Sequence, residues 1–163
     1  MPEMDAEVGH SDPRVPDRRN CVTRYLIDDS ATAQPDETFA VFEDGGRWTY
    51  AELHTLVVTK AAGLQKLGVE RGDHVAAWLP DGRDALIAFF AVNYLGAVFV
   101  PFNTAYRGAI LEHVLANSDA SLLIAHGGLI DRLSGIDTAA ISRIISIGEF
   151  SADLPFEMFD FEE

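Results

Sequence analysis

The sequence predicts an α/β protein in which a β-hairpin precedes a partial parallel sheet of βαβ units. Three observations support this class. Short apolar stretches of strand length alternate with helical patterns between residues 74 and 147. Before them, an Asp-Gly pair separates two aromatic stretches, and a capping box opens a long helical pattern. Alternation of strand and helix at this spacing is typical of βαβ units, whose strands are parallel.

The first elements are expected to be a short helix and the hairpin. Residues 22–33 carry apolar side chains at Val22, Tyr25 and Leu26 and are followed by Pro35, which predicts a helix that ends before the proline. Residues 39–42 and 47–50 flank the segment Glu-Asp-Gly-Gly. Asp-Gly between two such stretches indicates a hairpin.

The strongest local signal is a helix that begins at Thr49. Thr49 and Glu52 form a capping box, in which each side chain accepts a hydrogen bond from the other residue's amide. Gly68 is expected just past the helix end. Between these signals, apolar residues recur at helical spacing, at Leu53, Leu56, Val57, Ala61, Leu64 and Leu67.

The rest of the chain is expected to alternate between strands and helices. Gly96 is placed at the C-terminal cap of a helix, and Pro101 ends a fully buried strand. The predicted elements are strands at 74–79, 97–100, 120–125 and 144–147, and helices at 83–95, 107–116 and 128–133. The helix at 107–116 is expected to gather its apolar residues on one side, at Ile110, Leu111, Val114 and Leu115.

Three segments follow from this pattern. Residues 1–20 are polar and rich in proline, and we expect a flexible leader without a signal peptide. Residues 21–148 form the α/β subdomain, and residues 149–163 are expected to be an acidic tail or a truncated connection. Residues 85–106 contain no charge and are long enough to span a bilayer. Because a glycine and a proline interrupt them, a buried helix and strand explain them better than a membrane span.

Composition excludes several classes of protein. The 26 acidic and 12 basic residues give a net charge of −14, which argues against a nucleic-acid binder or a polybasic membrane-surface protein. The one cysteine, Cys21, allows no internal disulfide, and a cytoplasmic location fits best. We expect no nucleic-acid partner and no membrane span, and an exposed sheet edge would allow self-association.

No residue is predicted to be catalytic, cofactor-binding or metal-binding. A G-x-G-x-x-G fingerprint is absent, and the glycine pair at 63–68 is followed by Val-Glu instead of the Lys-Ser/Thr of a phosphate loop. The histidines show no pair spaced for a metal. Asp81 and Asp84 bracket a helix start, which favours a capping role. Glu112 and His113 are adjacent on a helix and therefore point apart.

Three ordered stretches resemble a known family. Residues 48–53 (WTYAEL), 68–76 (GVERGDHVA) and 94–103 (YLGAVFVPFN) are similar to the opening of adenylate-forming enzymes, the AMP-binding and acyl-CoA synthetase superfamily. Residues 103–108 and 112–118 extend the likeness, which is closest to acyl-CoA ligases of the carnitine and crotonobetaine type. It covers about residues 21–147 and implies the N-terminal part of the acyl-CoA synthetase fold.

The resemblance also implies a reaction. A carboxylic acid attacks the α-phosphate of ATP to give an acyl-adenylate and pyrophosphate, and coenzyme A then displaces AMP. Mg²⁺ offsets the phosphate charge. In this family the phosphate loop that ends in Pro-Lys-Gly and the catalytic lysine come later than the region matched here. Neither is present before Glu163, so no ATP-contacting residue carries over.

Three readings remain open at this point. The first is an N-terminal fragment of an acyl-CoA synthetase that is inactive alone and needs no cofactor of its own. The second is a complete, non-enzymatic α/β binding or interaction module. The third is an unrelated flavodoxin-like domain, against which the lack of any flavin or phosphate loop counts.

Overall fold

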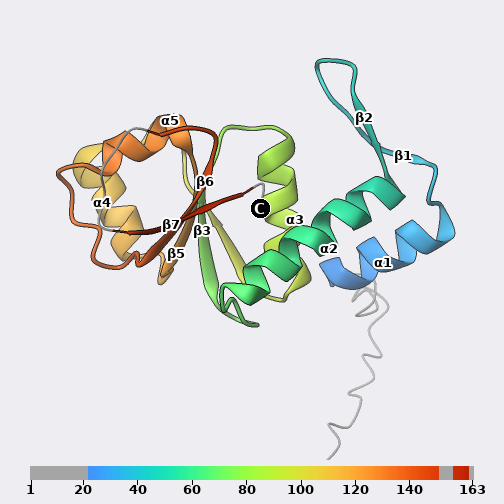
Figure 1. The fold of residues 1–163 in the computed structure, drawn as a ribbon, viewed down its shortest axis with the longest axis horizontal. Helices are drawn as coiled ribbons and strands as arrows, with labels where there is room; N and C mark the ends of the chain where they lie inside the picture. Colours follow the sequence, from blue (N-terminus) through green and yellow to red (C-terminus); the bar gives the residue numbers. More distant parts are fainter. Residues whose placement is uncertain (1–21, 151–155, 162–163) are drawn as a thin grey trace, which may run out of the picture.

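The main body of the protein is a five-stranded sheet with helices on both faces (Figure 1). The computed structural model describes residues 22–150 and 156–161, so the expected leader at 1–20 lies outside the described residues. The strand order is β4-β3-β5-β6-β7, and every neighbouring pair is parallel. The predicted α/β class with a parallel sheet is therefore confirmed.

The hairpin stands apart from this sheet as a separate antiparallel pair (Figure 1). It consists of β1 (Thr38–Val41) and β2 (Arg47–Thr49). The Phe42 amide donates to the Gly46 carbonyl at 2.8 Å, and Gly45 takes a φ of 82°, which favours glycine. The hairpin prediction is confirmed.

Helices α1 (Thr23–Ala33) and α2 (Tyr50–Lys66) lie beside each other near the hairpin. The α2 capping box forms as predicted, because the Glu52 amide donates to Thr49 Oγ1 at 3.2 Å and the Thr49 amide donates to Glu52 Oε2 at 2.8 Å. Gly68 closes the other end at a φ of 84°. Both ends of α2 are therefore set by local sequence.

The three central strands are buried on both faces. They are β3 (His74–Trp78), β5 (Leu122–His126) and β6 (Arg143–Ile147). Alternate residues serve two cores, so that Val75 packs with α2 and α3, whereas its neighbour Ala76 packs with α4 and α5. A strand covered on both sides is apolar throughout, and this explains why these strands were predictable.

Four helical segments connect the strands. They are α3 (Arg83–Tyr94), α4 (Gly108–Ala116), α5 (Gly127–Ile130) and a 3₁₀ turn (Asp131–Leu133). Gly96 follows α3 at a φ of 74°, as expected for a residue after a helix end. Each predicted helix is present within about two residues of its expected ends, which is the usual uncertainty of such boundaries.

Three expectations about burial and capping were wrong. Strand β4 (Val98–Pro101) is an edge strand rather than a fully buried one, and the Val98 side chain is 42% exposed. In α4, Leu111 and Leu115 are buried, but Ile110 is 61% exposed. At the start of α3 the cap residue is Gly82, so the capping role expected for Asp81 is not observed, although Asp84 does lie in the first turn.

A further strand lies within the segment expected to be an acidic tail or a truncated connection, residues 149–163. Strand β7 (Glu157–Asp160) pairs in parallel with β6, and the next residue, Phe161, is only 5% exposed. The acidic composition concealed this strand, because its two apolar residues stand between the charged Glu157 and Asp160.

Across the residues that the structure describes, no helix is both long enough and apolar enough to cross a bilayer. The uncharged stretch at 85–106 instead forms most of α3 and then the edge strand β4.

Candidate functional site

The main candidate site is an apolar groove where strands β3 and β4 end. Parallel sheets bind ligands outside the carboxyl ends of their strands, so this is the edge at which a site is expected. The groove has a volume of about 480 Å³. Its walls come from the hairpin, the start of α3 and the residues that follow the two strands, notably Val41, Phe42, Leu79, Leu86, Pro101 and Phe102.

An exposed ion pair ties the hairpin wall to α3. Arg83 Nη2 donates to both carboxylate oxygens of Asp44, at 2.7 and 2.9 Å, and the guanidinium lies 4.2 Å from the ring centroid of Phe42. The hydrogen bond from Arg83, helped by the amide of Gly46, lowers the pKa of Asp44 below its ordinary value. The pair therefore links the hairpin wall of the groove to the start of α3.

A second set of contacts fixes the end of β3 on the other face. Trp78 is fully buried, and its indole N–H donates to the Asn103 carbonyl at 3.1 Å. Arg132 donates to the Thr104 carbonyl at 2.6 Å, and its guanidinium lies 5.8 Å from the Trp78 ring. These bonds position the loop that follows β4, next to the groove.

The groove can hold an apolar group but offers little for chemistry. Asp81 is the one titratable side chain among its lining residues. A phosphate would need convergent N–H or cationic donors, and the lining supplies no lysine, arginine or histidine. In the described part of the chain, no group of three or more His, Cys, Asp or Glu residues could hold a metal ion, so the Mg²⁺ that the resemblance implies is assigned to no residue here.

Of the described residues weighed in the sequence, Asp81 lines the groove, and the others make local contacts elsewhere. Glu112 accepts from the Asp137 amide at 3.1 Å, whereas His113 bonds Asn117 on its own helix, so the two point apart as predicted. His54 pairs with Asp28 at 3.2 Å between α1 and α2. The glycine pair at 63–68 lies at the end of α2, and His10 falls outside the described residues.

Sequence reasoning did not find the groove residues. Leu79 and Phe102 each follow directly after a strand, and in a parallel sheet all such positions meet at one edge. That rule was a usable signal. The contribution of Val41 and Phe42 was not predictable, because it depends on how the hairpin is placed against α3.

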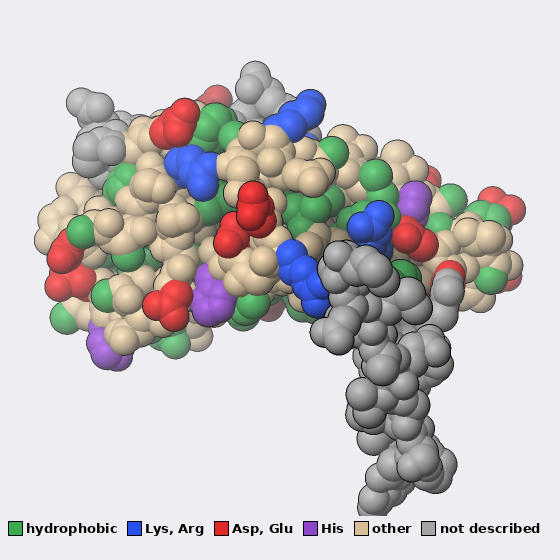
Figure 2. Space-filling view, turned by 90° about the horizontal axis from the view of Figure 1, so that it is seen from below, with side chains coloured by type: hydrophobic (Ala, Val, Ile, Leu, Met, Phe, Trp, Pro, Cys, Tyr) green, Lys and Arg blue, Asp and Glu red, His purple; other side chains and the backbone are tan. Residues whose placement is uncertain are grey.

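Surface charge is mixed rather than concentrated. Figure 2 shows one face on which acidic, basic and histidine side chains are interspersed, without a continuous basic area. With a net charge of −14 the chain as a whole is strongly acidic. On this face the structure offers no positive surface that would match a nucleic-acid backbone.

Comparison with known proteins places the chain among enzymes that form adenylates. Residues 27–157 match the family described as AMP-binding enzyme. A methyl-dioxo-octahydroindenyl-propanoyl:CoA ligase of Mycobacterium tuberculosis is 38% identical over 112 residues, which are 68% of this chain and 22% of that protein. A 2-succinylbenzoate–CoA ligase of a Geobacillus strain is 33% identical over 127 residues, which are 78% of this chain and 25% of that protein.

The fold agrees with solved structures of the same group. The fatty acyl-CoA synthetase of Mycobacterium tuberculosis superposes with a TM-score of 0.70 at 25% identity, over 80% of this chain and 27% of that one. The chain thus spans about a fifth to a quarter of the length of these curated relatives. Because the family match covers most of the described residues and both ligases exceed 30% identity, the chain belongs to the AMP-binding enzyme family.

Proposed function

We propose that the chain is the N-terminal portion of an ATP-dependent acyl-CoA synthetase. The reaction of the whole enzyme joins a carboxylic acid to coenzyme A. The acid carboxylate attacks the α-phosphate of ATP and releases pyrophosphate, and the coenzyme A thiol then attacks the acyl carbon and releases AMP. Mg²⁺ would neutralise phosphate charge in the first step.

One observation carries this proposal. The family match runs over residues 27–157, and the similar ligases extend far beyond the matched region. Their names specify carboxylic acids of different shape, an indenyl-propanoate and a succinylbenzoate, so the acyl group is proposed only as a class. The apolar groove at the end of β3 and β4 is compatible with a wall near an apolar substrate.

We propose further that these 163 residues do not catalyse adenylate formation alone. Lys60 and Lys66 are the only lysines of the chain, and neither stands in a Pro-Lys-Gly sequence. The lining of the groove at the ends of β3 and β4 offers no cluster of donor side chains that would hold a triphosphate. We therefore expect no productive ATP binding by these residues alone.

The test is ATP–pyrophosphate exchange by the purified chain with a panel of saturated and aromatic carboxylic acids. The long-chain-fatty-acid–CoA ligase of Bacillus subtilis, which is 30% identical over 137 residues, serves as the active control. We expect exchange by the control and none by the chain. Exchange by the chain that rises with acid concentration would overturn the proposed inactivity.

The reading as an N-terminal portion has its own test, which is the coding sequence beyond codon 163. A downstream loop that ends in Pro-Lys-Gly supports it, whereas a stop codon overturns it. In that case a complete, non-enzymatic binding module becomes the better description.

Two finer statements belong to the same proposal. We propose a cytoplasmic location, because a single cysteine allows no internal disulfide and suits a reducing compartment. Self-association is proposed through an exposed sheet edge, because unpaired strand edges present N–H and C=O groups that another chain can bond.

A further inference from the structure

The sheet has two outer strands in the described part of the chain, β4 and β7, and they differ in what they offer a partner. In β4, the amides of Val98 and Phe102 donate to strand β3 and its preceding residue. Because successive residues of a strand face opposite edges, Phe99 and Pro101 face outward. Pro101 has no N–H, so this edge can offer a single strand amide and is blunted against pairing.

The outer edge of β7 has no such block. The Phe161 amide donates to the Ser146 carbonyl at 3.0 Å, which fixes residues 157, 159 and 161 toward β6. Met158 and Asp160 therefore direct both their N–H and their C=O groups outward. Two consecutive outward residues, neither of them proline, can form a regular antiparallel ladder.

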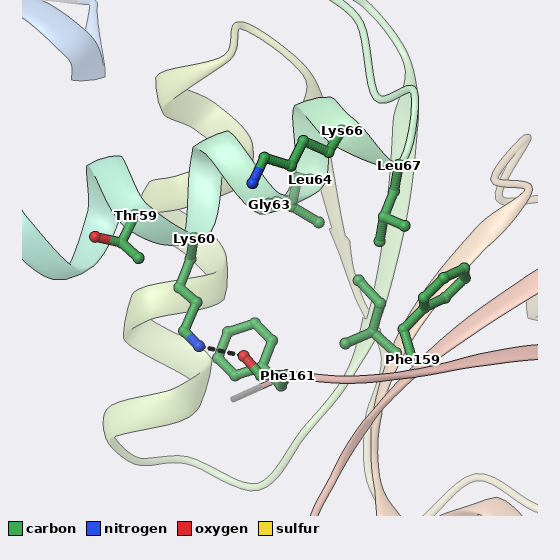
Figure 3. Close-up of a pocket in the computed structure, with 9 residues that line it drawn as sticks. Thr59, Lys60, Gly63, Leu64, Lys66, Leu67, Phe159 and Phe161 are labelled. Carbon is green, nitrogen blue, oxygen red and sulfur yellow. Dashed lines mark hydrogen bonds between the residues drawn. The ribbon is translucent and has the colours of Figure 1, made fainter. Parts of the chain in front are cut away.

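Beside this edge lies a groove with a cationic rim. It has a volume of about 210 Å³ and lies between the second half of α2 and strands β6 and β7. Figure 3 shows apolar side chains on its floor, among them Leu64, Phe159 and Phe161. Lys60 donates to the Phe161 carbonyl and lies 4.9 Å from its ring centroid, and Lys66 lies farther along the same helix.

The charges on this face are arranged so that they suit a second copy of the chain. Glu157 is exposed at one end of the β7 segment, and Lys60 lies over Phe161 at the other end. Within the described residues, neither Glu157 nor Lys60 forms a salt bridge. A two-fold axis through the centre of the segment places Glu157 of one copy next to the end of the other copy's segment where Lys60 lies.

We propose that the chain dimerises by antiparallel pairing of β7 with β7 of a second copy, centred on Phe159. This specifies the edge of the self-association proposed above. Met158 of each copy exchanges hydrogen bonds with Asp160 of the other, and Phe159 faces its own counterpart. Glu157 then lies opposite Phe161 of the second copy, beneath the Lys60 that covers that ring, so two symmetric ion pairs form.

The experiment is sedimentation equilibrium of the full chain over a wide concentration range, with three variants. Met158→Pro removes an outward N–H and leaves the bonds to β6 in place, and we expect dimerisation to weaken at least about tenfold. Glu157→Lys should weaken it by roughly threefold or more, with less effect at high salt. The charge swap Glu157→Lys with Lys60→Glu should restore dimerisation.

Val98→Lys on the outer strand β4 is the matched control, and we expect it to leave the dimer unchanged. A chain that stays monomeric at every concentration overturns the proposal, and so does dissociation by Val98→Lys but not by Met158→Pro. A charge swap that fails to restore association overturns the centred register. These outcomes are independent of ATP–pyrophosphate exchange, so failure of the dimer and failure of the proposed reaction are distinguishable.

Discussion

The two outer strands of the sheet reverse what their sequences suggest. Strand β4 comes from the least polar stretch of the chain, yet Val98 is 42% exposed. Strand β7 comes from the acidic segment 149–163, yet Phe161 beside it is 5% exposed. The hydropathy of a segment therefore does not tell whether its strand lies at the edge or in the middle of the sheet.

Side-chain packing explains how each edge tolerates its composition. At β4, aromatic rings shield one another, since Phe99 contacts Phe89 at 5.4 Å and Phe89 contacts Phe90 at 5.1 Å between ring centroids. At β7, Phe159 and the adjacent Phe161 pack in the core beneath α2, and Met158 packs against the core on the other face of the sheet, whereas Glu157 at the start of the strand is exposed. The apolar edge strand β4 is covered by clustered aromatic rings, whereas the apolar side chains of the acidic strand β7 pack into the cores on both faces of the sheet.

The largest expected effect lies between the two outer strands, in the buried strand β3. Trp78→Ala in β3 removes a fully buried ring and the indole bond to Asn103. We expect a loss of about 3–5 kcal/mol in the free energy of unfolding. Urea unfolding followed by circular dichroism measures it. The edge control Val98→Ala should cost less than about 1 kcal/mol, and equal losses at both positions would contradict the assigned strand order.

The second prediction compares the anchors of the two edges. Phe161→Ala should cost about 2–4 kcal/mol, because the ring fills the core beneath α2. Phe89→Ala should cost about 1 kcal/mol, because its ring is 40% exposed. Amide hydrogen exchange should show faster exchange in β7 for the first variant alone. If Phe89→Ala is the more damaging change, the burial ascribed to β7 is wrong.

A third change removes the proline that protects β4. Pro101→Ala supplies an outward N–H at the β4 edge, and we expect a change in stability within about 1 kcal/mol but greater association at high concentration. Light scattering against concentration measures the association. Pro80→Ala, outside the sheet, is the control. Unchanged scattering by Pro101→Ala would show that the proline does not protect this edge.

The smallest effect is expected at the hairpin, where the Arg83 hydrogen bond lowers the pKa of Asp44 from 3.8. Since the folded-state pKa is the lower one, the pair contributes above the ordinary pKa, and its contribution is lost as pH falls through the lowered value. Both groups are exposed, so the effect on global stability should be small. The protection factors of amides in residues 38–49, which correct for the intrinsic pH dependence of exchange, should fall at low pH, and Asp44→Asn should remove that fall without altering β3.

Much of the architecture was predictable because its signals are local. The capping box at Thr49, the Asp-Gly turn and the glycines that end α2 and α3 each depend on a few neighbouring residues. The central strands were predictable because strands covered on both faces are uniformly apolar. Of the candidate site, only the edge of the sheet could have been predicted, through the residues that follow β3 and β4.

The sequence by itself determined the order of the elements up to β6, the α/β class and, through its ordered motifs, the family. Only the tertiary structure decided that β4 and β7 are the outer strands, that Ile110 is exposed, and that the hairpin forms one wall of a groove. The physical reason is range. Caps, turns and periodicity arise between residues a few positions apart, whereas the position of a strand depends on its pairing with segments far along the chain, which no local pattern encodes.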